Sequence, residues 1–80
     1  MSTRKLCRRM DIRTVLARNL KRIREERGYS QEDLAFRADL HRTYVSGVER
    51  GVRNPTIVIV QKLAEALEVE AKDLLAAKSE

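Results

Sequence analysis

The chain has 80 residues, of which 17 are Lys or Arg and 12 are Asp or Glu, and its formal net charge is +5. This length allows one domain with a thin core, and the basic balance favours a polyanionic partner, with nucleic acid ahead of an anionic membrane surface. Cys7 is the only cysteine and His41 the only histidine, which excludes an internal disulfide and a cysteine–histidine zinc site. Self-association therefore remains as a further source of stability.

Residues 1–10 are basic and lack apolar periodicity, and we expect them to form a flexible arm. They contain no apolar run of the kind that a signal peptide needs. Nowhere does the sequence reach the ~20 apolar residues that span a bilayer. We therefore expect a cytoplasmic protein without a membrane partner. Cys7 lies in this arm and is interpreted as an incidental thiol.

The first two predicted helices follow from apolar spacing and from end signals. Apolar residues recur at helical intervals over residues 12–23 and predict a first helix. This helix should end near Gly28, because glycine accommodates the left-handed position after a helix. Ser30 is a good N-cap for a second helix, and the acidic residues that follow it complement the helix dipole. The second helix is expected to bury Leu34, Ala35 and Ala38.

A third and a fourth helix are expected on either side of a loop. The third covers residues 42–50 and is stopped by Gly51. The loop covers residues 52–55, and Thr56 then caps a fourth helix that continues to about Leu67. The start of this segment is rich in β-branched residues, which favour strands. Strong helix formers follow it, however, and no partner strand is available elsewhere.

The fifth predicted helix covers residues 71–77 and follows Glu70, which is a poor N-cap, so its start is expected to fray. Together these segments predict an all-α fold, a compact five-helix bundle. Residues 11–78 are expected to form one domain, in which the second and third helices make a helix-turn-helix and the C-terminal helices support dimerisation.

The third helix has two different faces. On a helical wheel, Val45 and Val48 point inward with Glu49 beside them. The opposite face carries arginines, hydroxyls and a glycine, namely Arg42, Thr43, Ser46, Gly47 and Arg50. Arginine pairs bidentately with guanine in the major groove, and Ser or Thr serves base edges or phosphates. This composition indicates a DNA-reading face rather than an ordinary solvated one.

Gly47 lies in the interior of this helix, where glycine costs about 1 kcal/mol relative to alanine. Two interpretations remain equally open. Either a nucleic-acid backbone approaches closely at this position, or another helix packs against it.

Glu49 faces inward, where an unpaired carboxylate would be costly. Arg24 follows an inward-facing residue of the first helix and is the candidate partner. We predict a partly buried Arg24–Glu49 pair that fixes the third helix to the first, with a structural rather than a catalytic role.

The fourth helix carries more apolar surface than one core contact needs. One stripe consists of Ile57, Val60, Ala64 and Leu67, and another of Ile59, Leu63 and Ala66. One stripe should pack on the helix-turn-helix, while the other would form an exposed patch that a two-fold partner covers. The predicted dimer interface consists of Ile59, Leu63, Val69, Leu74 and Leu75. Burial of both stripes within one chain is the less favoured alternative.

Three blocks resemble, in order, the Cro/phage-repressor helix-turn-helix family: NLKRIR at 19–24, GYSQEDLA at 28–35 and VSGVERG at 45–51. The resemblance covers about residues 14–75 and implies a lambda-repressor-like DNA-binding fold. Residues 41–50, with the following Arg53 and Asn54, resemble more narrowly the controller proteins of bacterial restriction–modification systems, which are small homodimers. Relatives usually carry Ser or Thr at the position of Glu70.

The resemblance also implies roles for individual residues. The predicted base contacts are Arg42, Thr43, Ser46 and Arg53. The predicted contacts to the DNA backbone are Gln31, Tyr44, Asn54 and Arg50. Arg24 and Glu49 match the family's structural ion pair, in agreement with the wheel.

The function expected from these observations is a homodimeric transcriptional regulator of a palindromic operator in double-stranded DNA, with RNA polymerase as a further possible partner and with no cofactor or metal. A restriction–modification controller, a phage-type repressor and an antitoxin-type autoregulator remain alternatives. A basic amphipathic module that binds membranes or proteins is disfavoured, because tryptophan is absent and Phe36 is the only phenylalanine. An enzyme is rejected, because no second histidine, phosphate-binding glycine loop or paired acidic group is present.

Overall fold

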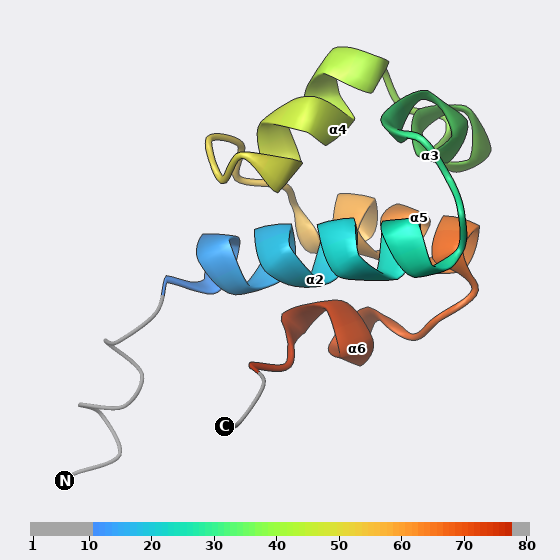
Figure 1. Cartoon of the computed structure of the whole chain (residues 1–80). Coiled ribbons are helices and arrows are strands. Elements are labelled where there is room, and N and C mark those ends of the chain that lie inside the picture. The colour runs from blue at the N-terminus through green and yellow to red at the C-terminus, as the bar shows by residue number, and fades with distance from the viewer. Residues whose placement is uncertain (1–10, 78–80) are drawn as a thin grey trace, which may run out of the picture.

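A computed structural model describes residues 11–77, which form five α-helices in the order α2 (Ile12–Glu26), α3 (Gln31–Ala38), α4 (Arg42–Glu49), α5 (Ile57–Leu67) and α6 (Ala71–Leu75) (Figure 1). The all-α prediction and the helix-turn-helix made by α3 and α4 are confirmed. The arm at residues 1–10, with Cys7, and residue 78 of the predicted domain lie outside the described residues.

The helices stack in three levels. In Figure 1, α2 crosses the middle of the molecule with α5 behind it, α3 and α4 lie on one side, and α6 lies on the other. The contacts agree, because α2 touches both α4 and α6, and α5 touches both α3 and α6. The helix-turn-helix and α6 therefore sit on opposite sides of the α2–α5 level.

The helix starts are set by side chains that accept backbone hydrogen bonds. Ser30 Oγ accepts from the Asp33 N–H and Asp33 Oδ2 accepts from the Ser30 N–H, both at 3.0 Å, which is a reciprocal cap. The hydrogen bond from the Ser30 backbone N–H holds the pKa of Asp33 below its usual value. Thr56 Oγ1 accepts from the Ile59 N–H at 3.3 Å. Both predicted caps are thus present.

One leucine-rich core joins all the helices. The fully buried residues of largest volume come from α2, α3, α4, α5 and α6, and they are Leu20, Leu34, Leu63, Leu67, Leu74, Val45 and Val48. The predicted inward residues of α3, namely Leu34, Ala35 and Ala38, are buried as expected.

The prediction that Leu63 and Leu74 lie in a dimer interface is wrong, because both side chains are 0% exposed within one chain. The buried stripe of α5 consists of Val60, Leu63, Ala64 and Leu67. In this buried stripe, Leu63 takes the place that was predicted for Ile57, which is 82% exposed. The wheel grouped Val60, Ala64 and Leu67 correctly but put Leu63 in the wrong stripe, because the rotation of α5 depends on how α3 and α6 pack against it.

The last helix is shorter than predicted and ends at Leu75. The Asn19 carboxamide, buried on α2, donates to the carbonyl of Leu74 at 2.8 Å and to that of Ala76 at 2.9 Å. These bonds hold the chain extended after Leu75, so the helix does not continue to residue 77. At its start, Asp73 Oδ2 accepts from the Glu70 N–H at 3.0 Å.

Candidate nucleic-acid interface

The position of α4 is fixed by its inner face and by the turn before it. Val45 and Val48 are buried, while Arg42 and Thr43 are exposed at the start of the helix. Asp39 takes a left-handed backbone conformation (φ 58°), and the Leu40 N–H donates to the Ala35 carbonyl at 2.8 Å. This turn sets α4 across α3 so that the outer side of α4 faces solvent.

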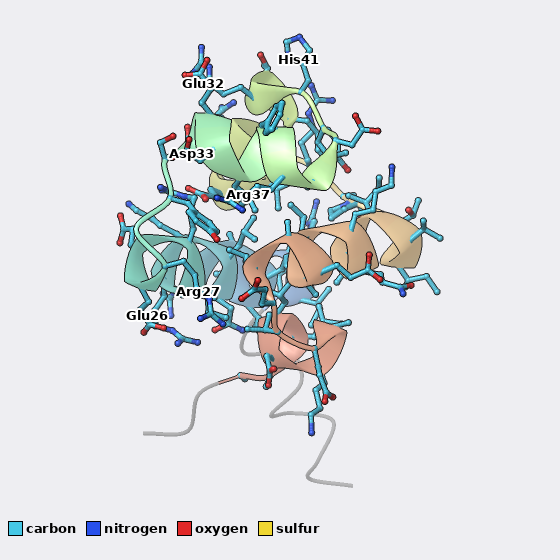
Figure 2. The ribbon with its side chains drawn as sticks, turned by 90° about the vertical axis from the view of Figure 1, so that its right-hand side faces the viewer. Glu26, Arg27, Glu32, Asp33, Arg37 and His41 are labelled. Carbon is cyan, nitrogen blue, oxygen red and sulfur yellow. The ribbon has the colours of Figure 1, made fainter. Side chains whose placement is uncertain are left out.

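His41 begins α4 as its N-cap. Its Nδ1 accepts from the Thr43 N–H at 3.4 Å. Figure 2 shows His41 and Glu32 projecting from the end of the molecule opposite α6. His41 is thus a capping residue, and α4 begins at a free end of the molecule.

The Arg24–Glu49 pair predicted from the wheel is present and bidentate. Arg24 Nε lies 2.6 Å from Glu49 Oε2 and Arg24 Nη2 lies 3.1 Å from Glu49 Oε1. The two side chains are only 10% and 4% exposed. Arg24 Nη1 also donates to the Tyr29 carbonyl at 2.8 Å. The hydrogen bonds to Glu49 raise the pKa of Arg24, and the pair ties α2 to the end of α4.

Gln31 extends this network in a way that the sequence did not indicate. Its Nε2 donates to Glu49 Oε1 at 3.0 Å. Because a carboxamide nitrogen carries two hydrogens, a second N–H remains for another acceptor. Gln31 is also the first residue of α3, where free backbone N–H groups and the helix dipole attract anions. The only sequence signal was the residue type, since the contact depends on how α3 and α4 pack.

The loop after α4 brings Arg53 back to this helix. The Arg53 guanidinium carbon lies 5.7 Å from the centroid of the Tyr44 ring, within the range of a cation–π contact. Arg50 Nε donates to Ser46 Oγ at 3.4 Å, and Asn54 is exposed beside Arg53. These contacts show that the outer side of α4 and the following loop form one surface.

The eight predicted DNA contacts thus lie on the start of α3, on α4 and on the loop that follows it. They comprise three arginines and five neutral polar residues, with no acidic residue: Gln31, Arg42, Thr43, Tyr44, Ser46, Arg50, Arg53 and Asn54. This surface can donate many hydrogen bonds and attract anions. Among residues 11–77, no group of three metal-ligating side chains exists, and no helix there is long and apolar enough to cross a bilayer.

Comparison with known proteins adds an independent observation. The sequence profile of the helix-turn-helix family matches residues 20–74, which contain α3, α4 and α5 in full. The control protein C.BamHI of Bacillus amyloliquefaciens is 46% identical over 66 residues, which cover 81% of this chain and 82% of that protein.

Solved structures give the same result for the fold. The crystal structure of the hypothetical transcription factor NHTF from Neisseria has a TM-score of 0.82 and 46% identity, over 84% of this chain and 77% of that one. The restriction–modification controller protein C.Esp1396I, as a tetramer with its natural 35 base-pair operator, has a TM-score of 0.73 and 36% identity, over 84% of this chain and 99% of that one.

Proposed function

Because the chain belongs to the helix-turn-helix family, we propose that it is a transcriptional regulator that recognises a two-fold symmetric operator in duplex DNA as a homodimer. The observation that carries this proposal is the outer side of α4. Arg42 and Thr43 are exposed there, while Val45 on the inner side is fully buried. A helix held in this way presents its polar face as a rigid unit, which the major groove admits.

The contacts divide into two kinds. Arg42, Thr43 and Ser46 on α4, and Arg53 in the loop, would meet base edges and so determine the preferred sequence. Gln31, Tyr44, Arg50 and Asn54 would meet phosphates and so fix the register of the protein on the duplex. This division is supported for Gln31 by its place at the first turn of α3.

The Arg24–Glu49 pair has a positioning role in this scheme. Glu49 accepts from both Arg24 and Gln31. The buried pair therefore fixes α4 against α2, and the bond to Glu49 leaves one Gln31 N–H for the phosphate that Gln31 would contact.

The proposed dimer surface lies on α5, on the turn that follows it and on the end of α6. Ile59, Val69 and Leu75 are partly exposed there, and α5 also leaves Ile57 and Val58 exposed, at 82% and 61%. These side chains form an apolar patch that a second copy would cover. Two copies would hold their α4 helices ~34–36 Å apart, about one turn of DNA.

The biological setting that we propose is control of a restriction–modification system. It is supported by the similarity to C.BamHI and C.Esp1396I. A regulator of this kind acts on promoter DNA, so RNA polymerase is included as a partner, and the exposed Phe36 on α3 offers it an apolar contact. The proposed place of action is the cytoplasm, at the nucleoid, and no catalytic activity is proposed.

The test is selection of bound duplexes from a randomised pool, followed by sedimentation of the protein with and without the recovered DNA. We expect an enriched two-fold symmetric sequence that binds two chains. We also expect the logarithm of the association constant to fall linearly with the logarithm of salt concentration, with a slope of about −0.9 per neutralised phosphate. Failure to enrich any duplex at low salt would contradict the proposal.

A further inference from the structure

Gly47 lies in the interior of α4, and its backbone conformation does not require glycine. The two glycines with positive φ are Gly28 and Gly51, each just beyond a helix. Gly47 has ordinary helical backbone geometry, where alanine is the more favourable residue. A reason for glycine must therefore lie in what surrounds its α-carbon.

The atoms nearest to a side chain added at Gly47 all belong to Arg53. A Cβ built on Gly47 would lie 2.6 Å from Arg53 Cγ, 3.1 Å from Arg53 Nε and 3.4 Å from Arg53 Cδ, and these are the three nearest atoms. The first distance is shorter than real Cβ contacts allow. The side chain of Arg53 therefore crosses α4 directly over the bare α-carbon of Gly47. Neither interpretation left open by the sequence includes this contact.

The loop sets the starting point of Arg53. Gly51 has φ 77°, its N–H donates to the Val48 carbonyl at 3.0 Å, and the Val52 N–H donates to the Gly47 carbonyl at 3.0 Å. These bonds, with a left-handed residue between them, form a Schellman motif that turns the chain back over the helix end. Arg53 follows immediately, so its backbone is placed beside Gly47 by the hydrogen bonds of the turn.

The far end of the same side chain rests on Tyr44, with the guanidinium carbon 5.7 Å from the ring centroid. Arg53 is thus guided at three points: by the turn at its backbone, by Gly47 along its methylene stem and by Tyr44 at its guanidinium. Because recognition of a base requires the planar guanidinium in one orientation, a side chain held in advance loses less freedom on binding.

We propose that Gly47 is a positioning residue that determines the base preference of the protein through Arg53. Any larger residue at 47 displaces the Arg53 stem from α4 and releases its guanidinium from the Tyr44 ring. Gly47 itself contacts no base in this scheme. The inference rests on the proposed function, because it assigns the alignment of one of the residues that read DNA.

The first test is the stability of Gly47→Ala. The atoms nearest to the added Cβ belong to Arg53, an exposed and flexible side chain that can move away, while alanine improves the helix propensity of α4. We expect a melting temperature that is unchanged or raised by up to about 8 °C. A clear fall in the melting temperature would overturn the inference, because Gly47 would then be required for packing of the fold.

The second test is a double-mutant cycle on base preference. Gly47→Ala, Arg53→Ala and the double variant are compared by selection from a pool in which each operator position is varied. We expect Gly47→Ala to reduce discrimination by roughly 5- to 100-fold at the same position as Arg53→Ala. The double variant should match Arg53→Ala within about 2-fold, because two residues that act through one contact are not additive.

The remaining outcomes separate the two proposals. Unchanged base preference in Gly47→Ala, or losses that add in the double variant, would overturn the inference, since Gly47 would then be neutral or would meet DNA directly. No base-specific loss in Arg53→Ala would overturn it too, while the proposed function would stand on Arg42. If the unaltered protein selected no sequence at all, the proposed function would fail and the inference with it.

Discussion

The two sides of the α2–α5 level are attached in different ways. On one side, α4 is fixed by a bidentate, buried Arg24–Glu49 pair that also holds Gln31. On the other side, α6 is attached by the apolar packing of Leu74 and by Asn19, which donates hydrogen bonds to the carbonyls of Leu74 and Ala76. The attachment of α4 includes an ion pair between two charged side chains, whereas that of α6 combines neutral hydrogen bonds with a leucine that packs by volume and shape.

This difference agrees with the proposed roles of the two sides. A buried ion pair is weak evidence for stability, since well-packed apolar residues often do as well. It is suited to holding one geometry, which a DNA-reading helix needs within about 0.5 Å. A proposed dimer surface tolerates small adjustments, and apolar packing permits them.

The largest expected effect comes from breaking the ion pair that attaches α4. Glu49→Ala leaves Arg24 buried without its partner and should reduce the free energy of unfolding by about 3–5 kcal/mol. This approaches the whole stability of a chain of this size. Glu26→Ala is the matched control, because it removes an exposed pair with Arg22 at 3.5 Å and should cost about 0–1 kcal/mol.

Urea denaturation of the two variants measures this contrast. Equal losses from Glu49→Ala and Glu26→Ala would show that the buried pair has no special part in fixing α4.

A second contrast lies within α6. Leu74 is fully buried, and Leu74→Ala should reduce the free energy of unfolding by about 2–5 kcal/mol. Its neighbour Leu75 is partly exposed, so Leu75→Ala should cost less and should mainly weaken self-association. Denaturation and sedimentation over a range of concentrations separate the two effects. If Leu74→Ala changed only the association, its reassignment from interface to core would be wrong.

The smallest expected effect concerns the start of α3. The hydrogen bond from Ser30 lowers the pKa of Asp33 in the folded protein below the value of 3.8 that applies when it is free. The stabilisation is therefore complete above pH 4 and is lost as pH falls through the lower, folded pKa. Asp33→Asn should be less stable than the parent at pH 6, and the difference should shrink as the pH falls below the free value of 3.8. An unchanged difference at low pH, measured by denaturation, would contradict this role.

Much of the fold was predictable because helix ends depend on local chemistry. Ser30 and Thr56 cap helices by bonding to residues three positions ahead, and Gly28 and Gly51 have the positive φ that glycine favours. The Arg24–Glu49 pair was predictable too, since an inward carboxylate needs a cation and the first helix offers one at the right position.

The errors came from contacts that depend on how helices are oriented. A wheel shows that α5 has two apolar stripes, but it does not show where the core ends between them, so it places Leu63 in the dimer interface although Leu63 is buried with Val60 and Leu67. The extent of α6 depends on Asn19, 55 residues before Leu74. Likewise, the contact between Arg53 and Gly47 could not be predicted, because it depends on the loop that returns Arg53 to α4.

The most direct test of the central claim measures binding of Arg42→Ala and Gln31→Ala to the selected operator, to single-base variants of it and to random duplex. Lys72→Ala, which removes an exposed cation from α6 on the far side of the molecule, is the charge-matched control. We expect Arg42→Ala to lose about 1–3 kcal/mol on the operator and to relax the preference at one base pair of each half-site. Gln31→Ala should weaken all duplexes alike, and Lys72→Ala should change little. Equal losses from Arg42→Ala on operator and random DNA would contradict the claim that the outer side of α4 reads sequence.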